Sequence, residues 1–128
     1  RIFALEGDSG PYLQYTYARC RSVLRRAGIT NYQLSIINLR WTDEELALLR
    51  TLYRFSEIVE EAVKNFAPNL ICTFLFDLAQ KYNLLYNKLP ILKSEKKVRE
   101  FRLALTTATA QVLKNGLNLL GIETLEKM

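Results

Sequence analysis

The stretch SEKKVREFRLALTTATAQVLKNGLN, residues 94–118, decides the fold. Apolar side chains recur in it every three to four residues, which is the spacing of one face of an α-helix. Two such stripes run along it, one made of Val98, Phe101, Leu105, Ala108 and Val112 and the other of Leu103, Ala110, Leu113, Leu117 and Leu120. A helix that is apolar over so wide an arc is central to a domain, because it needs partners on more than one side.

Local start and stop signals divide the rest of the chain into further helices. Pro11, just after Asp8-Ser9-Gly10, predicts the start of a helix that Gly28 ends. Thr42, followed three residues later by Glu45, is a capping box and predicts a second start. Together with the apolar spacing, these signals predict helices over about residues 8–28, 42–55, 56–66, 69–87 and 94–118.

The whole pattern predicts an all-α fold. The segment of residues 33–39 is short and apolar, and its secondary structure is ambiguous; no other run is typical of a strand. A chain of 128 residues is long enough for one core and too short for two. We therefore expect a single domain, residues 1–128, folded as a bundle of about five helices, with residues 69–87 as the packing partner of residues 94–118.

The composition excludes several classes of protein. The chain has no histidine and only two cysteines, Cys20 and Cys72, so zinc sites and histidine-based catalytic triads are excluded. Both cysteines lie in apolar runs, which favours two buried, reduced thiols over a disulfide, and a cytoplasmic location. No apolar run approaches the ~18 residues that a membrane span needs, so we expect no membrane partner.

Charge is unevenly distributed along the chain. Residues 1–40 carry six basic and two acidic side chains, residues 41–63 carry two and six, and residues 64–128 carry ten and five. The net charge of +5 favours an anionic partner such as a nucleic acid. If the two basic ends meet in the fold, they form one positive face that orients a polyanion as well as attracting it.

The first predicted helix carries the sharpest functional signal. Its core stripe consists of Leu13, Tyr17, Cys20, Leu24 and Ala27. The opposite face gathers two aromatic rings and two guanidinium groups, those of Tyr12, Tyr15, Arg19 and Arg26. Exposed rings stack on unpaired RNA bases and arginine binds phosphates, but tyrosines also pack on neighbouring loops or on the rest of a longer protein. Spacing alone leaves both interpretations open and somewhat favours packing.

A second group of basic residues marks the start of the helix over residues 94–118. A cluster of this kind is usually only a solvated face, but it also opposes the helix dipole, which prefers acidic residues in the first turn. That local cost is typical of a functional patch. The cluster consists of Lys93, Lys96, Lys97, Arg99 and Arg102.

Several motifs resemble one known family. Residues 3–19, FALEGDSGPYLQYTYAR, closely resemble the EGDTGPYLQYxxAR segment that opens the C-terminal anticodon-binding domain of arginyl-tRNA synthetases. Residues 78–86, LAQKYNLLY, are similar to the family's LAxxFNxFY, with Tyr82 in place of the usual Phe. Residues 102–122 are similar to its RLxLxxAxxxVLKNGLxLLGI ending, and residues 126–128 resemble its PERM-type terminus.

This resemblance implies the anticodon-binding domain, of the DALR type, of a class I synthetase that joins arginine to its tRNA with ATP. Residues 1–10 would then enter from a catalytic domain that is not present. The family's HIGH and KMSK signatures do not occur in the sequence, so we expect no catalytic residue, cofactor or metal in this domain. ATP and arginine would be used by the catalytic domain. The expected partners are arginine tRNAs, through the anticodon arm, and that catalytic domain.

The resemblance also implies site residues. Tyr12, Tyr15, Tyr86 and Met128 would approach anticodon-loop nucleotides, and Asn83 would support that surface. With Arg19 and Arg26 from the helical spacing, these form the predicted tRNA-binding set, in a protein that we expect to be monomeric. The alternative is a helical protein-interaction or assembly domain, which would associate through residues 2–5 and the first helix.

Overall fold

A computed structural model describes residues 9–28 and 41–128. In these two ranges the chain forms five α-helices and no strand, so the all-α prediction is confirmed. The ambiguous residues 33–39 and the expected entry segment before residue 9 lie outside the described residues. The helices are α1 (Ser9–Arg26), α2 (Asp43–Tyr53), α3 (Phe55–Lys64), α4 (Asn69–Lys88) and α5 (Lys96–Leu119).

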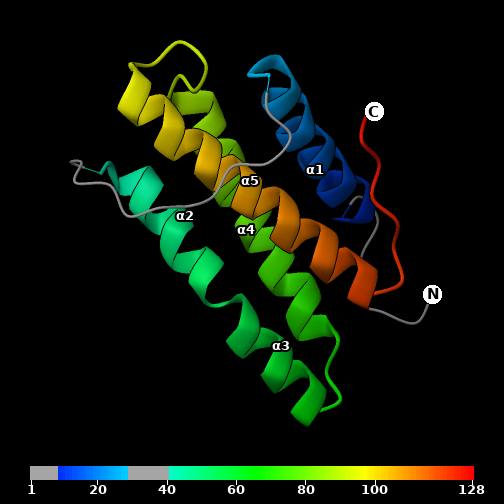
Figure 1. Cartoon of the computed structure of the whole chain (residues 1–128). Coiled ribbons are helices and arrows are strands. Elements are labelled where there is room, and N and C mark those ends of the chain that lie inside the picture. Colours follow the sequence, from blue (N-terminus) through cyan, green and yellow to red (C-terminus); the bar gives the residue numbers. More distant parts are fainter. Residues whose placement is uncertain (1–8, 29–40) are drawn as a thin grey trace.

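The long helix α5 lies in the middle of the bundle, as its two apolar stripes predict. It packs against α1, α2 and α4, and in Figure 1 it crosses the molecule with α1 on one side and α2 on the other. Its apolar side chains, including Phe101, Leu105 and Leu113, are buried. Gly116 allows a close approach to α4, because a Cβ atom there would lie 2.6 Å from the Cδ2 of Leu75.

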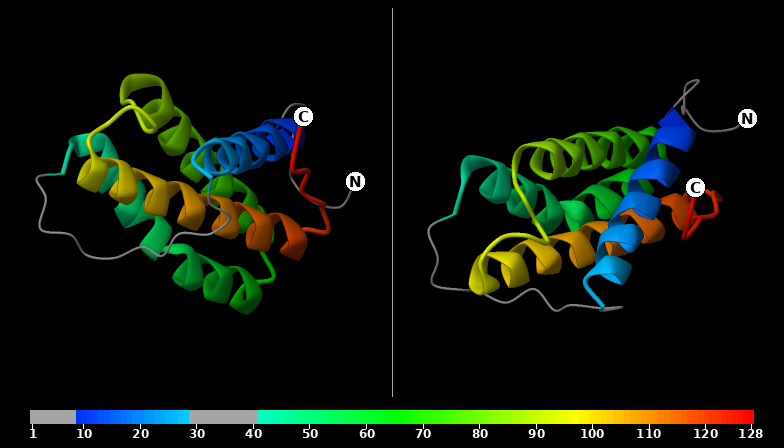
Figure 2. Two further views of the ribbon diagram at one scale, coloured as in Figure 1. Left: turned by 45° about the horizontal axis from the view of Figure 1, so that its top comes forward. Right: turned by 90° about the horizontal axis from the view of Figure 1, so that it is seen from above.

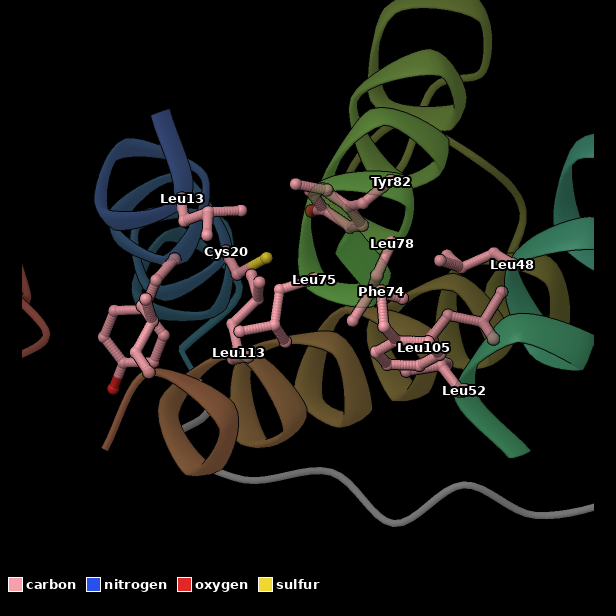
Figure 3. Close-up of a cluster of buried hydrophobic side chains, with 14 of the residues drawn as sticks. Leu13, Cys20, Leu48, Leu52, Phe74, Leu75, Leu78, Tyr82, Leu105 and Leu113 are labelled. Atoms are coloured by element: carbon pink, nitrogen blue, oxygen red, sulfur yellow. The ribbon is translucent and has the colours of Figure 1, made fainter. Parts of the chain in front are cut away.

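The core between α1, α4 and α5 is formed mostly by aliphatic side chains. Figure 3 shows Leu13 and Cys20 of α1 pointing toward Leu75 of α4 and Leu113 of α5. Tyr82, which stands where the resembled family usually has Phe, is also buried there, and its hydroxyl lies 3.1 Å from that of Thr106. The extra hydroxyl thus has a hydrogen-bond partner inside the core. None of the described helices is long and apolar enough to span a membrane.

One member of the predicted basic cluster points inward, which corrects the expectation of a uniformly exposed patch. Arg102 is buried, and its Nε donates to the Oε2 of Glu45 at 2.8 Å. Glu45 also completes the predicted capping box, because its Oε1 accepts from the backbone N–H of Thr42. The same arginine donates to the carbonyl of Pro90 at 2.5 Å. Arg102 therefore ties α5 to the start of α2 and to the turn after α4.

The chain after α5 turns back along α1. We call residues 121–128 the C-terminal tail, and Figure 2 shows it beside α1. Glu126 fastens it, because its carboxylate accepts from the hydroxyl of Tyr17 at 2.7 Å and from the Nε of Arg21 at 3.1 Å. These contacts lower the pKa of Glu126, while burial, followed by the bond to Glu126, raises the pKa of Tyr17 to about 12.

Candidate nucleic-acid interface

A hollow of about 360 Å³ lies where α1, the last turns of α4 and the C-terminal tail meet. We call it the first hollow. Five of the seven predicted site residues line it, namely Tyr15, Arg19, Arg26, Tyr86 and Met128. The other lining residues are Ala18, Ser22, Arg25 and Lys127. The fold thus brings together residues that are more than one hundred positions apart in the sequence.

Arg19 stands at the centre of the first hollow. Its guanidinium carbon lies 4.2 Å from the ring centroid of Tyr86 and 5.0 Å from that of Tyr15. One terminal nitrogen donates to the Tyr15 hydroxyl at 2.9 Å, and the other donates to the Oδ1 of Asn83 at 2.8 Å. Cation–π contacts with both rings add to these hydrogen bonds. Arg19 therefore holds the two tyrosines in place, with two of its five N–H donors engaged.

The remaining two predicted residues lie behind the hollow and support Arg19. The Nδ2 of Asn83 donates to the hydroxyls of Tyr12 and Thr16, each at 3.0 Å. These two bonds fix the orientation of the amide, so that its oxygen faces Arg19. Tyr12 is half-buried, with its ring centroid 5.3 Å from that of Phe76. Of the two outward tyrosines, Tyr12 thus packs on α4, whereas Tyr15 is 45% exposed.

The first hollow is positively charged. Four cationic side chains line it, those of Arg19, Arg25, Arg26 and Lys127, and the lining contains no acidic side chain. Within the described part of the chain, Arg26 and Lys127 form no ion pair. The nearby carboxylate of Glu126 is already engaged by Tyr17 and Arg21. An anionic ligand therefore meets four basic side chains and no acidic side chain in the lining.

Sequence reasoning missed two of these cations. Arg25 follows Tyr15 by ten residues, which places it about 80° around the helix from that ring and outside the stripe of Tyr12, Tyr15, Arg19 and Arg26. Helical spacing therefore does not group Arg25 with the other site residues. Lys127 reaches the hollow only because Glu126 fastens the tail, in part through the bond from Arg25 to the Glu126 carbonyl at 3.2 Å. No local pattern indicates that contact.

A protein-family model covers most of the chain. The model of the DALR anticodon binding domain matches residues 13–128. The chain belongs to the DALR anticodon-binding domain family.

Named relatives of this DALR domain are arginine–tRNA ligases. The chain is 43% identical to the ligase of Photobacterium profundum and 40% identical to one from Prochlorococcus marinus, over 99% and 100% of its length. It also resembles the solved structure of Thermus thermophilus arginyl-tRNA synthetase, at 38% identity and a TM-score of 0.84, over 98% of the chain. In each case the chain spans only about a fifth of the other protein, 22%, 21% and 22% respectively.

The arrangement in this DALR domain suits recognition of unpaired nucleotides. An exposed aromatic ring offers a stacking surface for any base, because every base has a π face. The cations beside it offer partners for phosphate oxygens. Tyr15 provides such a ring, and Arg26 and Lys127 provide such cations.

Proposed function

We propose that the first hollow binds nucleotides of the anticodon loop of arginine tRNAs. The observation that carries this proposal is Arg19, held between the rings of Tyr15 and Tyr86 inside a hollow lined by cations. Single-stranded loops are the part of an RNA whose bases are free to leave the stack and reach such rings. An A-form stem alone would offer phosphates, 2′-hydroxyls and base edges to the same surface, but no free base face on which a ring could stack.

We further propose that the chain acts as one domain of an arginine–tRNA ligase. Support comes from relatives with that name, of which the chain spans about a fifth. In this proposal a preceding catalytic domain uses ATP and arginine to charge the tRNA, whereas the domain described here only holds the anticodon arm. The ligase acts as a monomer in the cytoplasm.

A titration with anticodon stem-loops tests the binding proposal. We expect an arginine anticodon loop to bind more tightly than a loop of altered anticodon. With about four phosphate contacts, the logarithm of the binding constant should fall against the logarithm of salt concentration with a slope of about −3. Equal affinity for both loops, at every salt concentration, would contradict specific recognition of the loop.

Two matched tyrosine variants test the site. Tyr15→Ala is expected to weaken binding by about fivefold to 150-fold, the loss of ~1 to 3 kcal/mol that one stacked base contributes. Tyr53→Ala is the control, because Tyr53 is 69% exposed on α2 and does not line the hollow. Neither variant should change the melting temperature much. Equal effects of the two on RNA affinity would remove the site assignment.

A protein-contact surface is the second candidate function, favoured by a groove on the other side of the bundle. The groove, about 620 Å³, lies between α3 and the end of α5 and exposes the apolar side chains of Phe55, Val59 and Leu119. α1 begins at the same end of the bundle, because Gln14 donates to the carbonyl of Glu123 at 2.8 Å. In this proposal the occupant of the groove is the catalytic domain of the ligase, which would precede α1 in the chain.

The intact protein distinguishes the two surfaces. Leu119→Glu is expected to uncouple this domain from its neighbour, so that thermal unfolding shows two transitions in place of one, while affinity for the anticodon loop stays unchanged. Tyr53→Glu, also exposed but outside the groove, serves as the control. Identical unfolding curves for both variants and the unmodified protein would exclude the groove as a domain contact.

A further inference from the structure

A second hollow, of about 260 Å³, adjoins the first. The two hollows share Arg26 and Tyr86 as a common wall. The second one is otherwise lined by Val23 of α1 and by the turn between α4 and α5, which contributes residues 89–93. Its walls are therefore largely aliphatic, with one aromatic ring and two cations at the edge. Binding sites for small planar groups typically combine an apolar lining with a few charged groups in this way.

The turn that forms this hollow is held in a fixed shape. The buried Arg102 donates to the carbonyl of Pro90, and its own position is fixed by the ion pair with Glu45. The hydroxyl of Ser94 donates to the carbonyl of Ile91 at 2.7 Å. Ile91 itself is buried in the core. These contacts hold the turn that forms the hollow in one shape, which lowers the entropic cost of binding there.

The charge around the second hollow continues that of the first. Arg26 and Lys93 are exposed, and neither forms an ion pair with any residue in the ranges 9–28 and 41–128. Lys96 and Lys97 lie just beyond, exposed in the first turn of α5, which contains no acidic residue. The carboxylate of Glu95, before that turn, is engaged by the backbone N–H groups of residues 97 and 98. A positive strip therefore leads from one hollow past the other.

We propose that the second hollow is a subsite for another unpaired nucleotide of the same RNA. Its base lies against the aliphatic wall of Leu89 and Leu92, and its phosphate lies near Lys93. This assignment rests on the proposed function of the first hollow. It favours RNA over an acidic peptide, because the two hollows share the Tyr86 ring and a continuous strand fills both with the same chemistry.

Anticodon stem-loops that lack one base at a time test the subsite. With the unmodified protein, we expect two loop positions at which removal of the base weakens binding. Tyr15→Ala should abolish the effect at one position, because Tyr15 lines only the first hollow. Leu92→Ser should abolish it at the other position and weaken binding of the complete loop by about fivefold or more.

Two charge reversals accompany these variants. Lys93 is exposed, so Lys93→Glu should not affect folding. We expect this variant to weaken RNA binding, and to do so most for loops that carry the base at the second position. Lys64→Glu is the matched control, because Lys64 is exposed at the end of α3, away from both hollows. A thermal melt of each variant separates lost binding from lost folding.

The outcomes distinguish the two proposals. If Leu92→Ser leaves the pattern of base-sensitive positions unchanged while Tyr15→Ala removes one, the second subsite is wrong and the first hollow stands. A second outcome would also overturn the subsite: Lys93→Glu weakens the binding of all loops equally, and removal of the base matters at only one loop position. The second hollow would then supply charge and no base contact. If neither Tyr15→Ala nor any missing base changes affinity, the proposed function itself fails.

Discussion

The guanidinium of Arg19 lies 4.2 Å from the ring centroid of Tyr86 and so joins α1 to α4 across the first hollow. This contact makes one side chain responsible for the shape of two aromatic walls, because Arg19 also bonds to the hydroxyl of Tyr15. A flat guanidinium is able to stack on one ring while its nitrogens reach two separate acceptors, whereas a lysine ammonium is a point charge.

Arg19→Lys is therefore expected to weaken binding of an anticodon loop although the charge is kept. Loss of the stacked geometry should lower affinity by about tenfold, at ~1.4 kcal/mol, with little change in melting temperature. Arg25→Lys is the matched control, because Arg25 also lines the hollow, whereas the cation–π contacts with Tyr15 and Tyr86 are made by Arg19. Equal affinities for the two variants would mean that Arg19 acts only through its charge.

Replacing the buried Arg102 should destabilise the domain far more than replacing an exposed basic residue that also forms an ion pair. Arg102→Leu leaves the buried carboxylate of Glu45 without its cation, which typically costs about 3 to 5 kcal/mol. Lys88→Leu is the control, because Lys88 is exposed and its 3.4 Å contact with Glu44 lies at the surface, where solvent screening leaves ion pairs with little effect on stability. Chemical denaturation measures both, and similar unfolding free energies would show that the buried pair is energetically unimportant.

Gly116→Ala is expected to destabilise the contact between α4 and α5. The new Cβ atom would lie 2.6 Å from the Cδ2 of Leu75. Such overpacking costs about 1 to 3 kcal/mol, and the upper part of this range exceeds the ~1 kcal/mol that alanine gains over glycine in helix propensity. Gly10→Ala should instead be neutral or slightly stabilising, because nothing lies within 4 Å of its added Cβ. The double variant Gly116→Ala with Leu75→Val should recover part of the loss in a thermal melt.

Acidification should release the C-terminal tail from α1. The bond from Tyr17 and the neighbouring Arg21 lower the pKa of Glu126 below its usual 4.5. Its contribution to stability is therefore present above pH 4.5 and is lost as the pH falls through the lowered pKa of the folded state. The difference in unfolding free energy between the unmodified protein and Glu126→Gln should shrink over that range. A difference that stays constant with pH would show that Glu126 does not hold the tail.

Local signals were sufficient to predict the helices. The capping box of Thr42 and Glu45 is confirmed, and α4, predicted over about residues 69–87, spans Asn69–Lys88. These features depend on neighbours within one or two helical turns. The inward position of Arg102 was not predictable in this way, since its partner Glu45 lies 57 residues earlier in the chain.

The candidate site, too, was predictable from local spacing only in part. Helical spacing places Tyr15, Arg19 and Arg26 on one face of α1, and all three line the first hollow. The presence of Tyr86 and Met128 beside them depends on packing between distant segments, so only the resemblance to a known family indicated it. Spacing also could not separate Tyr12 from Tyr15, because the ring of Phe76 on α4 covers only the former.

The fastening of the tail by Glu126 has a consequence for the order in which the domain matures on the ribosome. Tyr17 and Glu126 are 109 residues apart, so α1 leaves the ribosome long before the residues that close the first hollow are synthesised. The helices α1 to α5 share a core of buried side chains that does not include the tail, and without the tail the hollow lacks Lys127 and Met128. Completion of the first hollow therefore requires a step of its own, in which Glu126 docks on α1.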